Sequence, residues 1–278
     1  MVISFTMARD IQHQHLSSSL SEINHLYGNN VHLFSSPICL SLLAKLGSPQ
    51  TKQPQINDLV SMLYTHMIDH VVDVLLPRTQ ANIETRMKEF HPEAIYEGQV
   101  IDPEAPAVCV DLARAGTLPS QVCYTKLNYL LNPDKVRQDH FYIARVSNEK
   151  GEVTGVSVAG SKIGGGVENA VVLFPDPMGA TGGTIVEAVK HYQNLPGGKP
   201  RLMVAMHLIV TPEYLAKVTK LCPDLVIFAL RLDRGLSEKN ILNEIPGTHW
   251  NLEKGLNSIQ YIVPGAGGLG EILNNSYC

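Results

Sequence analysis

The chain has 278 residues, of which 44% are hydrophobic and 17% are charged, and its formal net charge is −4 at pH 7. This size and composition are typical of a single α/β domain with an extension, and they allow a sizeable core. The slightly acidic balance excludes nucleic acid as the main partner, and no apolar run reaches the roughly 18 residues of a membrane span.

Two features of the sequence indicate where in the cell the protein is located: its first residues and its cysteines. The first ten residues contain a short apolar stretch with no basic segment before it, which is not typical of a signal peptide. The five cysteines are scattered, so their spacing fits neither a zinc site nor a disulfide framework. Cys109, within the apolar run "AVCVDLA", is expected to be a small buried residue. We therefore expect a cytoplasmic protein.

Residues 1–29 are polar and rich in Gln, His and Ser, which predicts an N-terminal extension before a domain over residues 30–278. Apolar residues recur at helical spacing between residues 56 and 75, which predicts an amphipathic helix. His66 and His70 lie four residues apart on this helix. No Glu follows His66, so the pair lacks the H-E-x-x-H zinc pattern, and we expect it to be structural or exposed.

Short apolar runs in the rest of the chain predict strands, at 107–113, 141–145, 170–174, 202–210 and 225–230. The runs are continuous rather than alternating, which indicates strands covered on both faces. Helices are predicted between strands, one opening at Gly183 and another at Thr211, which can cap it, followed by Pro212. This alternation predicts an α/β fold with a doubly wound, mainly parallel sheet flanked by helices, and residues 147–166 predict a β-hairpin flap.

The stretch "FPDPMGATGGT" (174–184) carries the strongest chemical signal. Asp176 follows a predicted strand, at the edge of an open α/β sheet where ligands bind. Glycines then allow close approach to a phosphate, and N–H groups at a helix start can hold its oxygens. The stretch is neither a Walker loop nor G-x-G-x-x-G. A plain tight turn before a helix is the alternative.

This stretch resembles the phosphoribosyl diphosphate (PRPP) loop of phosphoribosyltransferases, in the form found in the uracil phosphoribosyltransferase family. Three further stretches resemble that family in the same order: "NNVHLFSSPICLSLLAKL", "VDLARAGTL" and "QYIVPGAGGLGE". The resemblance covers residues 30–278. It implies a type I phosphoribosyltransferase fold and the transfer of phosphoribosyl from PRPP to uracil, giving UMP and diphosphate in pyrimidine salvage.

The resemblance also implies a set of site residues. Asp176 and Arg114 are the implied catalytic residues, at the ribose and the diphosphate respectively. Implied PRPP contacts are Arg114, Ala115, Gly116, Arg145, Asp176, Pro177, Met178, Gly179, Ala180, Thr181, Gly182, Gly183, Thr184 and Gly268. Implied uracil contacts are Tyr261, Ile262, Gly267, Gly268 and Leu269. Mg²⁺ is implied through the diphosphate of PRPP, with no metal held by the protein alone. A homodimer or homotetramer and a GTP effector are implied as well.

The chain departs from the family pattern at the base and metal end of the site. Gly268 stands where the family carries an Asp, and Leu269 stands where it carries an Ala, so activity is in doubt. Two alternatives therefore stay open: a phosphoribosyltransferase for another base, or a catalytically impaired homologue that binds a nucleotide or phosphate in a regulatory or assembly role. Residues near 237–258 are an insertion, predicted to form a helical arm or an interface, in which Trp250 anchors a loop.

Overall fold

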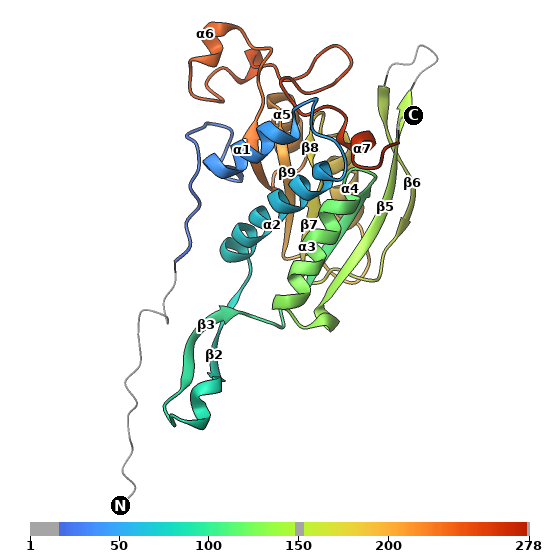
Figure 1. Ribbon diagram of the computed structural model, residues 1–278. Coiled ribbons are helices and arrows are strands. Elements are labelled where there is room, and N and C mark those ends of the chain that lie inside the picture. The colour runs from blue at the N-terminus through green and yellow to red at the C-terminus, as the bar shows by residue number, and fades with distance from the viewer. Residues whose placement is uncertain (1–16, 148–152, 277–278) are drawn as a thin grey trace, which may run out of the picture.

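The computed structural model describes residues 17–147 and 153–276, and its centre is an eight-stranded sheet within that part of the chain (Figure 1). The strand order is β1-β10-β9-β7-β4-β5-β6, and the short β8 pairs with β9. All described pairs in this sheet are parallel except β5 with β6. The strands are β1 (Val31–Leu33), β4 (Ala107–Ala113), β5 (Val136–Ser147), β6 (Val153–Lys162), β7 (Val171–Pro175), β8 (Met178–Gly179), β9 (Leu202–Val210) and β10 (Val226–Leu232).

Helices cover both faces of the sheet. Helices α1 (Pro37–Leu46), α2 (Gln55–Leu75) and α3 (Thr117–Leu130) share one hydrophobic core with the sheet and lie in front of it in Figure 1. Helices α4 (Gly183–Gln193) and α5 (Pro212–Leu221) share a second core on the other face. The predicted doubly wound, mainly parallel sheet flanked by helices is confirmed.

Local sequence explains where these helices begin and what they bury. The predicted amphipathic helix is α2, in which nine side chains between Ile56 and Val72 face the core at 0–5% exposure, while Met62 faces away at 54%. Thr211 caps α5 as predicted, because its Oγ1 accepts a hydrogen bond from the Tyr214 N–H at 3.0 Å. His66 and His70 contact each other edge to face, with ring centroids 4.7 Å apart, and both are partly buried.

The strand predictions are confirmed with shifted ends. Strands β4 and β9 have the predicted bounds, while β5 is longer than the predicted 141–145. Strands β5 and β6 form an antiparallel hairpin with Arg145 in register with Val156, but its first strand begins at Val136, well before the predicted range 147–166. The predicted tip of this flap, 148–152, lies outside the described residues. Cys109 is fully buried, and burial raises the pKa of its thiol.

A second hairpin was not predicted from the sequence. Strands β2 (Arg78–Glu84) and β3 (Ile95–Ile101) pair antiparallel, with a 3₁₀ turn at Arg86–Glu89 between them. They project away from the body of the molecule (Figure 1).

Within the described part of the chain, no helix combines the length and the apolar character needed to cross a membrane.

The insertion at 237–258 forms little helix, contrary to the predicted helical arm. It holds only the short α6 (Lys239–Leu242) and a 3₁₀ turn at Trp250–Leu252. Its loops are fixed instead by polar contacts. The Trp250 indole Nε1–H donates to the carbonyl of Pro212 at 3.0 Å, so Trp250 anchors a loop, as predicted.

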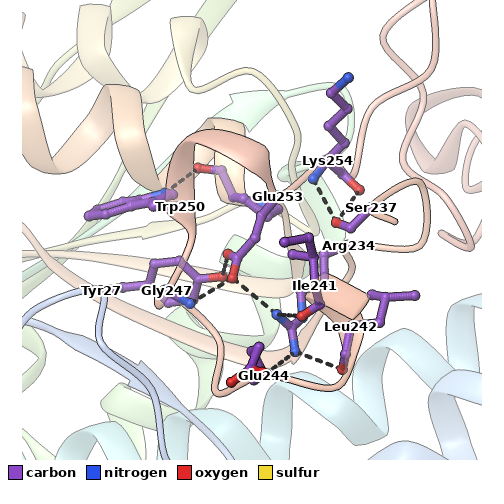
Figure 2. Close-up of polar contacts among 11 residues, drawn as sticks. Tyr27, Arg234, Ser237, Ile241, Leu242, Glu244, Gly247, Trp250, Glu253 and Lys254 are labelled. Atoms are coloured by element: carbon purple, nitrogen blue, oxygen red, sulfur yellow. Dashed lines mark hydrogen bonds and ion pairs between the residues drawn. The ribbon is translucent and has the colours of Figure 1, made fainter. Parts of the chain in front are cut away.

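A buried carboxylate joins this insertion to the N-terminal segment (Figure 2). Glu253 accepts hydrogen bonds from the Tyr27 hydroxyl, from Arg234 Nη1 at 3.0 Å and from the Gly247 N–H at 2.9 Å. Arg234 also donates to the carbonyls of Ile241, Leu242 and Glu244. The boundary between extension and domain stays a prediction, but Tyr27 is buried against the domain.

Removing the charge of Glu253 is expected to destabilise the fold. A Glu253→Gln variant leaves the guanidinium of Arg234 in a nearly buried position without its anion, which costs about 3 kcal/mol of unfolding free energy. Urea denaturation measures this loss. The matched control is Glu238→Gln at an exposed position, expected within about 0.5 kcal/mol of the parent chain. A loss for Glu253→Gln no larger than that of the control contradicts the assignment.

Candidate functional site

A cavity of about 690 Å³ opens at the carboxyl ends of β4 and β7. This is the edge of a parallel sheet at which α/β proteins bind ligands. Its walls come from the end of β4, from Asp176 after β7, from the loop entering α4, from the β5–β6 hairpin and from residues 260–271.

The cavity brings together most of the residues singled out in the sequence. Those that line it are Arg114, Ala115, Asp176, Met178, Ala180, Thr181, Gly182, Gly183, Thr184, Tyr261, Ile262, Gly267, Gly268 and Leu269. They come from segments more than 60 residues apart in the chain, so the fold, and not the local sequence, assembles them. Their individual roles stay predictions.

Four predicted site residues are not part of this lining. Gly116 and Gly179 are buried beneath it, and a Cβ at Gly179 would lie 2.7 Å from the Val210 side chain. Pro177 is also buried, and its carbonyl accepts from two N–H groups of β9. Arg145 lies on β5, and its side chain is outside the part of the chain that the structure describes.

The loop into α4 has the geometry of an anion site. Gly182 adopts a φ of +74°, and a Cβ there would lie 2.6 Å from Val218 Cγ2, so only glycine fits. The Val186 N–H donates to the Gly182 carbonyl at 3.1 Å and starts the helical ladder. The N–H groups before it have no carbonyl partner within the helix, and this end of α4 lines the cavity.

Thr211 fixes this loop from below. Its Oγ1 donates to the Ala180 carbonyl at 2.7 Å, and its N–H donates to the Gly179 carbonyl at 3.1 Å. Thr211 is fully buried and also caps α5. One threonine therefore sets the position of the loop relative to both β9 and α5.

A buried histidine holds the backbone of Asp176. His207 Nδ1 lies 2.6 Å from the Asp176 carbonyl, and His207 Nε2 lies 2.6 Å from the Tyr214 hydroxyl. Burial lowers the pKa of His207 to about 4, so the ring is neutral near pH 7. The neutral ring donates from Nδ1 to the carbonyl and accepts the Tyr214 proton at Nε2. The signal for this residue in the sequence is a lone His inside the apolar run "LMVAMHLIV", where a histidine must be buried.

An ion pair holds the opposite wall. Asp233 accepts from Arg231 Nε at 2.6 Å and from the Gly265 N–H at 2.7 Å. Arg231 Nη2 donates to the Gly265 carbonyl at 3.0 Å. Both backbone groups of Gly265 are thus fixed within the segment that carries Ile262 and Gly267. These two charged residues were also missed in the sequence, because only the fold brings them to Gly265.

Arg114 stands at the end of β4 and is exposed. Its Nη1 donates to the hydroxyl of Ser276. On the same side, Gly268 precedes the short α7 (Leu269–Ile272), and Leu269 is 1% exposed and packs into the core. Among residues 17–147 and 153–276, no three His, Cys, Asp or Glu side chains are grouped so as to hold a metal ion.

The sequence comparisons with known proteins point to one family. The family model described as uracil phosphoribosyltransferase matches residues 33–248. A uracil phosphoribosyltransferase of Campylobacter curvus is 24% identical over 247 residues, covering 89% of this chain and 99% of the relative. One of Mycoplasma genitalium is 26% identical over 240 residues, covering 85% and 94%. The solved structure of the AQ2163 protein from Aquifex aeolicus aligns with a TM-score of 0.66 at 18% identity, covering 88% of this chain and 97% of that one, which shows a shared fold.

Burial of a neutral His207 makes stability depend on pH. The folded pKa of about 4 lies below the ordinary value of 6.5, so the unfolded chain binds the extra proton between these values. The stabilisation is complete above pH 6.5 and is lost as the pH falls towards 4, which amounts to about 2 kcal/mol between pH 7 and pH 5. A His207→Asn variant can keep a donor to Asp176 but cannot titrate. Urea denaturation at both pH values is expected to show a smaller acid loss for the variant by that amount; an equal loss contradicts this assignment.

Proposed function

The chain belongs to the uracil phosphoribosyltransferase family, and from this premise we propose that it transfers phosphoribosyl from PRPP to uracil, giving UMP and diphosphate. The observation that supports this most is the single cavity that joins the α4 loop, Asp176, Arg114 and the 260–268 segment. These parts supply neutral N–H donors, a carboxylate, a cation and an ordered backbone. PRPP and uracil present a phosphate, ribose hydroxyls, a diphosphate and an imide edge.

The α4 loop is proposed to bind the 5′-phosphate. Its donors are backbone N–H groups from Thr181 to Thr184 and the two threonine hydroxyls. Such donors hold a dianion without adding a formal charge, and the helix start contributes a favourable dipole. The rigid position of Gly182 against Val218 keeps these donors aimed at one point.

Asp176 is proposed to bind the ribose hydroxyls. Its main chain is fixed at both ends, because its N–H donates to the Met206 carbonyl at 3.0 Å and its carbonyl accepts from His207. A carboxylate held in this way accepts hydrogen bonds from the two hydroxyls. It also favours the positive charge that develops on the sugar as the bond from C1′ to the diphosphate oxygen breaks.

Arg114 is proposed to bind the leaving diphosphate, since its guanidinium can donate paired hydrogen bonds to phosphate oxygens. Bound Mg²⁺ would neutralise part of the same charge. The donor set fits this ion, because the carboxylates of Asp176 and of Glu271, on α7, line the cavity. Mg²⁺ commonly binds one or two carboxylates together with substrate phosphates. Asp176 is the residue that would meet the ion on the ribose side.

The 260–268 segment is proposed to read uracil through main-chain groups of Ile262 and Gly267. The Val263 N–H donates to the Gly255 carbonyl at 2.8 Å, and Asp233 fixes Gly265, so this backbone is ordered before a base arrives. Uracil N1 bonds to C1′ as the bond from C1′ to the diphosphate oxygen breaks, and the N1 proton is released to water, so the products are UMP, diphosphate and a proton. Catalysis then rests on positioning and on stabilising the leaving group.

Two observations favour a second candidate, a binder or a transferase with another base preference. Gly268 offers no side chain to the cavity. Leu269 has a larger side chain than the Ala of the family pattern, so it leaves less room at the edge of the cavity. A cytoplasmic location, assembly into a homodimer or homotetramer, and a GTP effector are proposed on family membership alone.

A turnover assay with PRPP, Mg²⁺ and a panel of bases tests the proposed function. We expect UMP from uracil and no nucleotide from purines. An Asp176→Asn variant removes the charge at the ribose, and its kcat/KM is expected to fall about 100-fold, while Glu238→Gln retains full activity. If no base gives a nucleotide while UMP still binds, the transferase proposal fails and the regulatory alternative stands.

A further inference from the structure

Glu271, on the short α7, reaches back over Gly268 into the cavity. A Cβ built on Gly268 would collide with Oε2 of Glu271 and would lie 3.3 Å from its Cδ. Both residues line the cavity. The carboxylate therefore occupies the space in which any side chain at position 268 would begin, and the absence of one there makes room for it.

This carboxylate is not engaged by the protein. It makes no hydrogen bond or ion pair with any residue of the part that the structure describes, and Glu271 is only partly buried. The other contacts of Glu271 are through its main chain. Its N–H donates to the Gly268 carbonyl, and its carbonyl accepts from the Ser276 N–H, both at 3.1 Å.

The same Ser276 links Glu271 to Arg114, whose Nη1 donates to the Ser276 hydroxyl. Ser276 thus contacts the main chain of Glu271 and the guanidinium of Arg114, and both of these residues line the cavity. The guanidinium attracts a polyanion there, while the carboxylate repels it unless a cation lies between them. A divalent cation reverses the sign of the second effect, because it is attracted by both the carboxylate and the phosphate oxygens.

We propose that the carboxylate of Glu271 couples the binding of PRPP to Mg²⁺: it weakens binding of the free anion and strengthens binding of the Mg²⁺ complex. This inference rests on the proposed function, since it takes PRPP as the ligand of the cavity. It assigns a binding role to a residue that the motifs of the sequence did not single out, and it gives a reason for a glycine at position 268.

Calorimetric titration of PRPP into the full chain, with EDTA and then with increasing Mg²⁺, tests this proposal. The parent chain is expected to bind PRPP more tightly as Mg²⁺ rises. In Glu271→Gln most of this gain is lost, so affinity at saturating Mg²⁺ falls about tenfold. With EDTA the variant binds at least as tightly as the parent chain. Glu238→Gln, an exposed change on the insertion, is expected to behave as the parent chain.

Two further variants test whether the position of the carboxylate over Gly268, and not misfolding, causes the loss of the Mg²⁺ response. Gly268→Ala adds a methyl group where the carboxylate lies and is expected to weaken the Mg²⁺ response as well. The double change Gly268→Asp with Glu271→Ala removes the longer side chain, returns a carboxylate to the same space and is expected to restore the response. Thermal melting of each variant shows that it is folded.

The results separate the two proposals. An unchanged Mg²⁺ response in Glu271→Gln, or an equal loss of affinity with and without Mg²⁺, overturns the role of Glu271 and leaves the proposed function standing. Failure of the double change to restore the response overturns the placement. If the parent chain binds no PRPP at any Mg²⁺ concentration, the proposed function itself fails, and this inference fails with it.

Discussion

Parallel pairing of β4, β7 and β9 is the constraint on which the site depends. Cys109 pairs with Leu173, and Leu173 pairs with Val204, so the three strands run in register and end at one edge. Arg114 and Asp176 follow two of these ends. Antiparallel pairing would send one of the two to the opposite edge, and no cavity could include both. The chemistry proposed for the cavity therefore depends on the direction of three strands whose residues are nearly all buried.

Strand direction brings the site residues to one edge of the sheet, and buried polar groups then fix the main chain of the two walls of the cavity. His207 and Tyr214 fix the main chain of Asp176, while Asp233 fixes Gly265 on the far wall. His207, Tyr214 and Asp233 are each buried and hydrogen-bonded, either to one another or to the backbone of the site, so their burial carries little penalty. Buried groups therefore position both walls of the cavity, while the side chains that would contact a ligand, such as Asp176 and Arg114, stay accessible.

The sequence predicted the parts of this fold whose signal is local. Strands β4 and β9 are continuous apolar runs, and the α4 loop has its glycines, its aspartate and its helix start within eleven residues. The β2–β3 hairpin escaped prediction because "RTQANIE" and "IYEGQVI" carry mixed polar residues, and six of the seven β3 residues are only partly buried. Contacts such as Asp233 with Gly265 join residues 32 positions apart, so no spacing rule could find them.

The insertion near 237–258 shows how a segment outside the cavity can still bear on it. The Gly235 N–H donates to the Val263 carbonyl at 3.0 Å, and the Val263 N–H donates to the Gly255 carbonyl. Gly255 in turn is held by the carboxylate of Glu213 at 2.9 Å, on the first turn of α5. Val263 adjoins Ile262, so the main chain proposed to bind the base is hydrogen-bonded to Gly235, just before the insertion, and to Gly255, near its end. A chain in which this insertion were shorter would need other partners for those two backbone groups, because buried N–H and carbonyl groups are costly to leave unpaired.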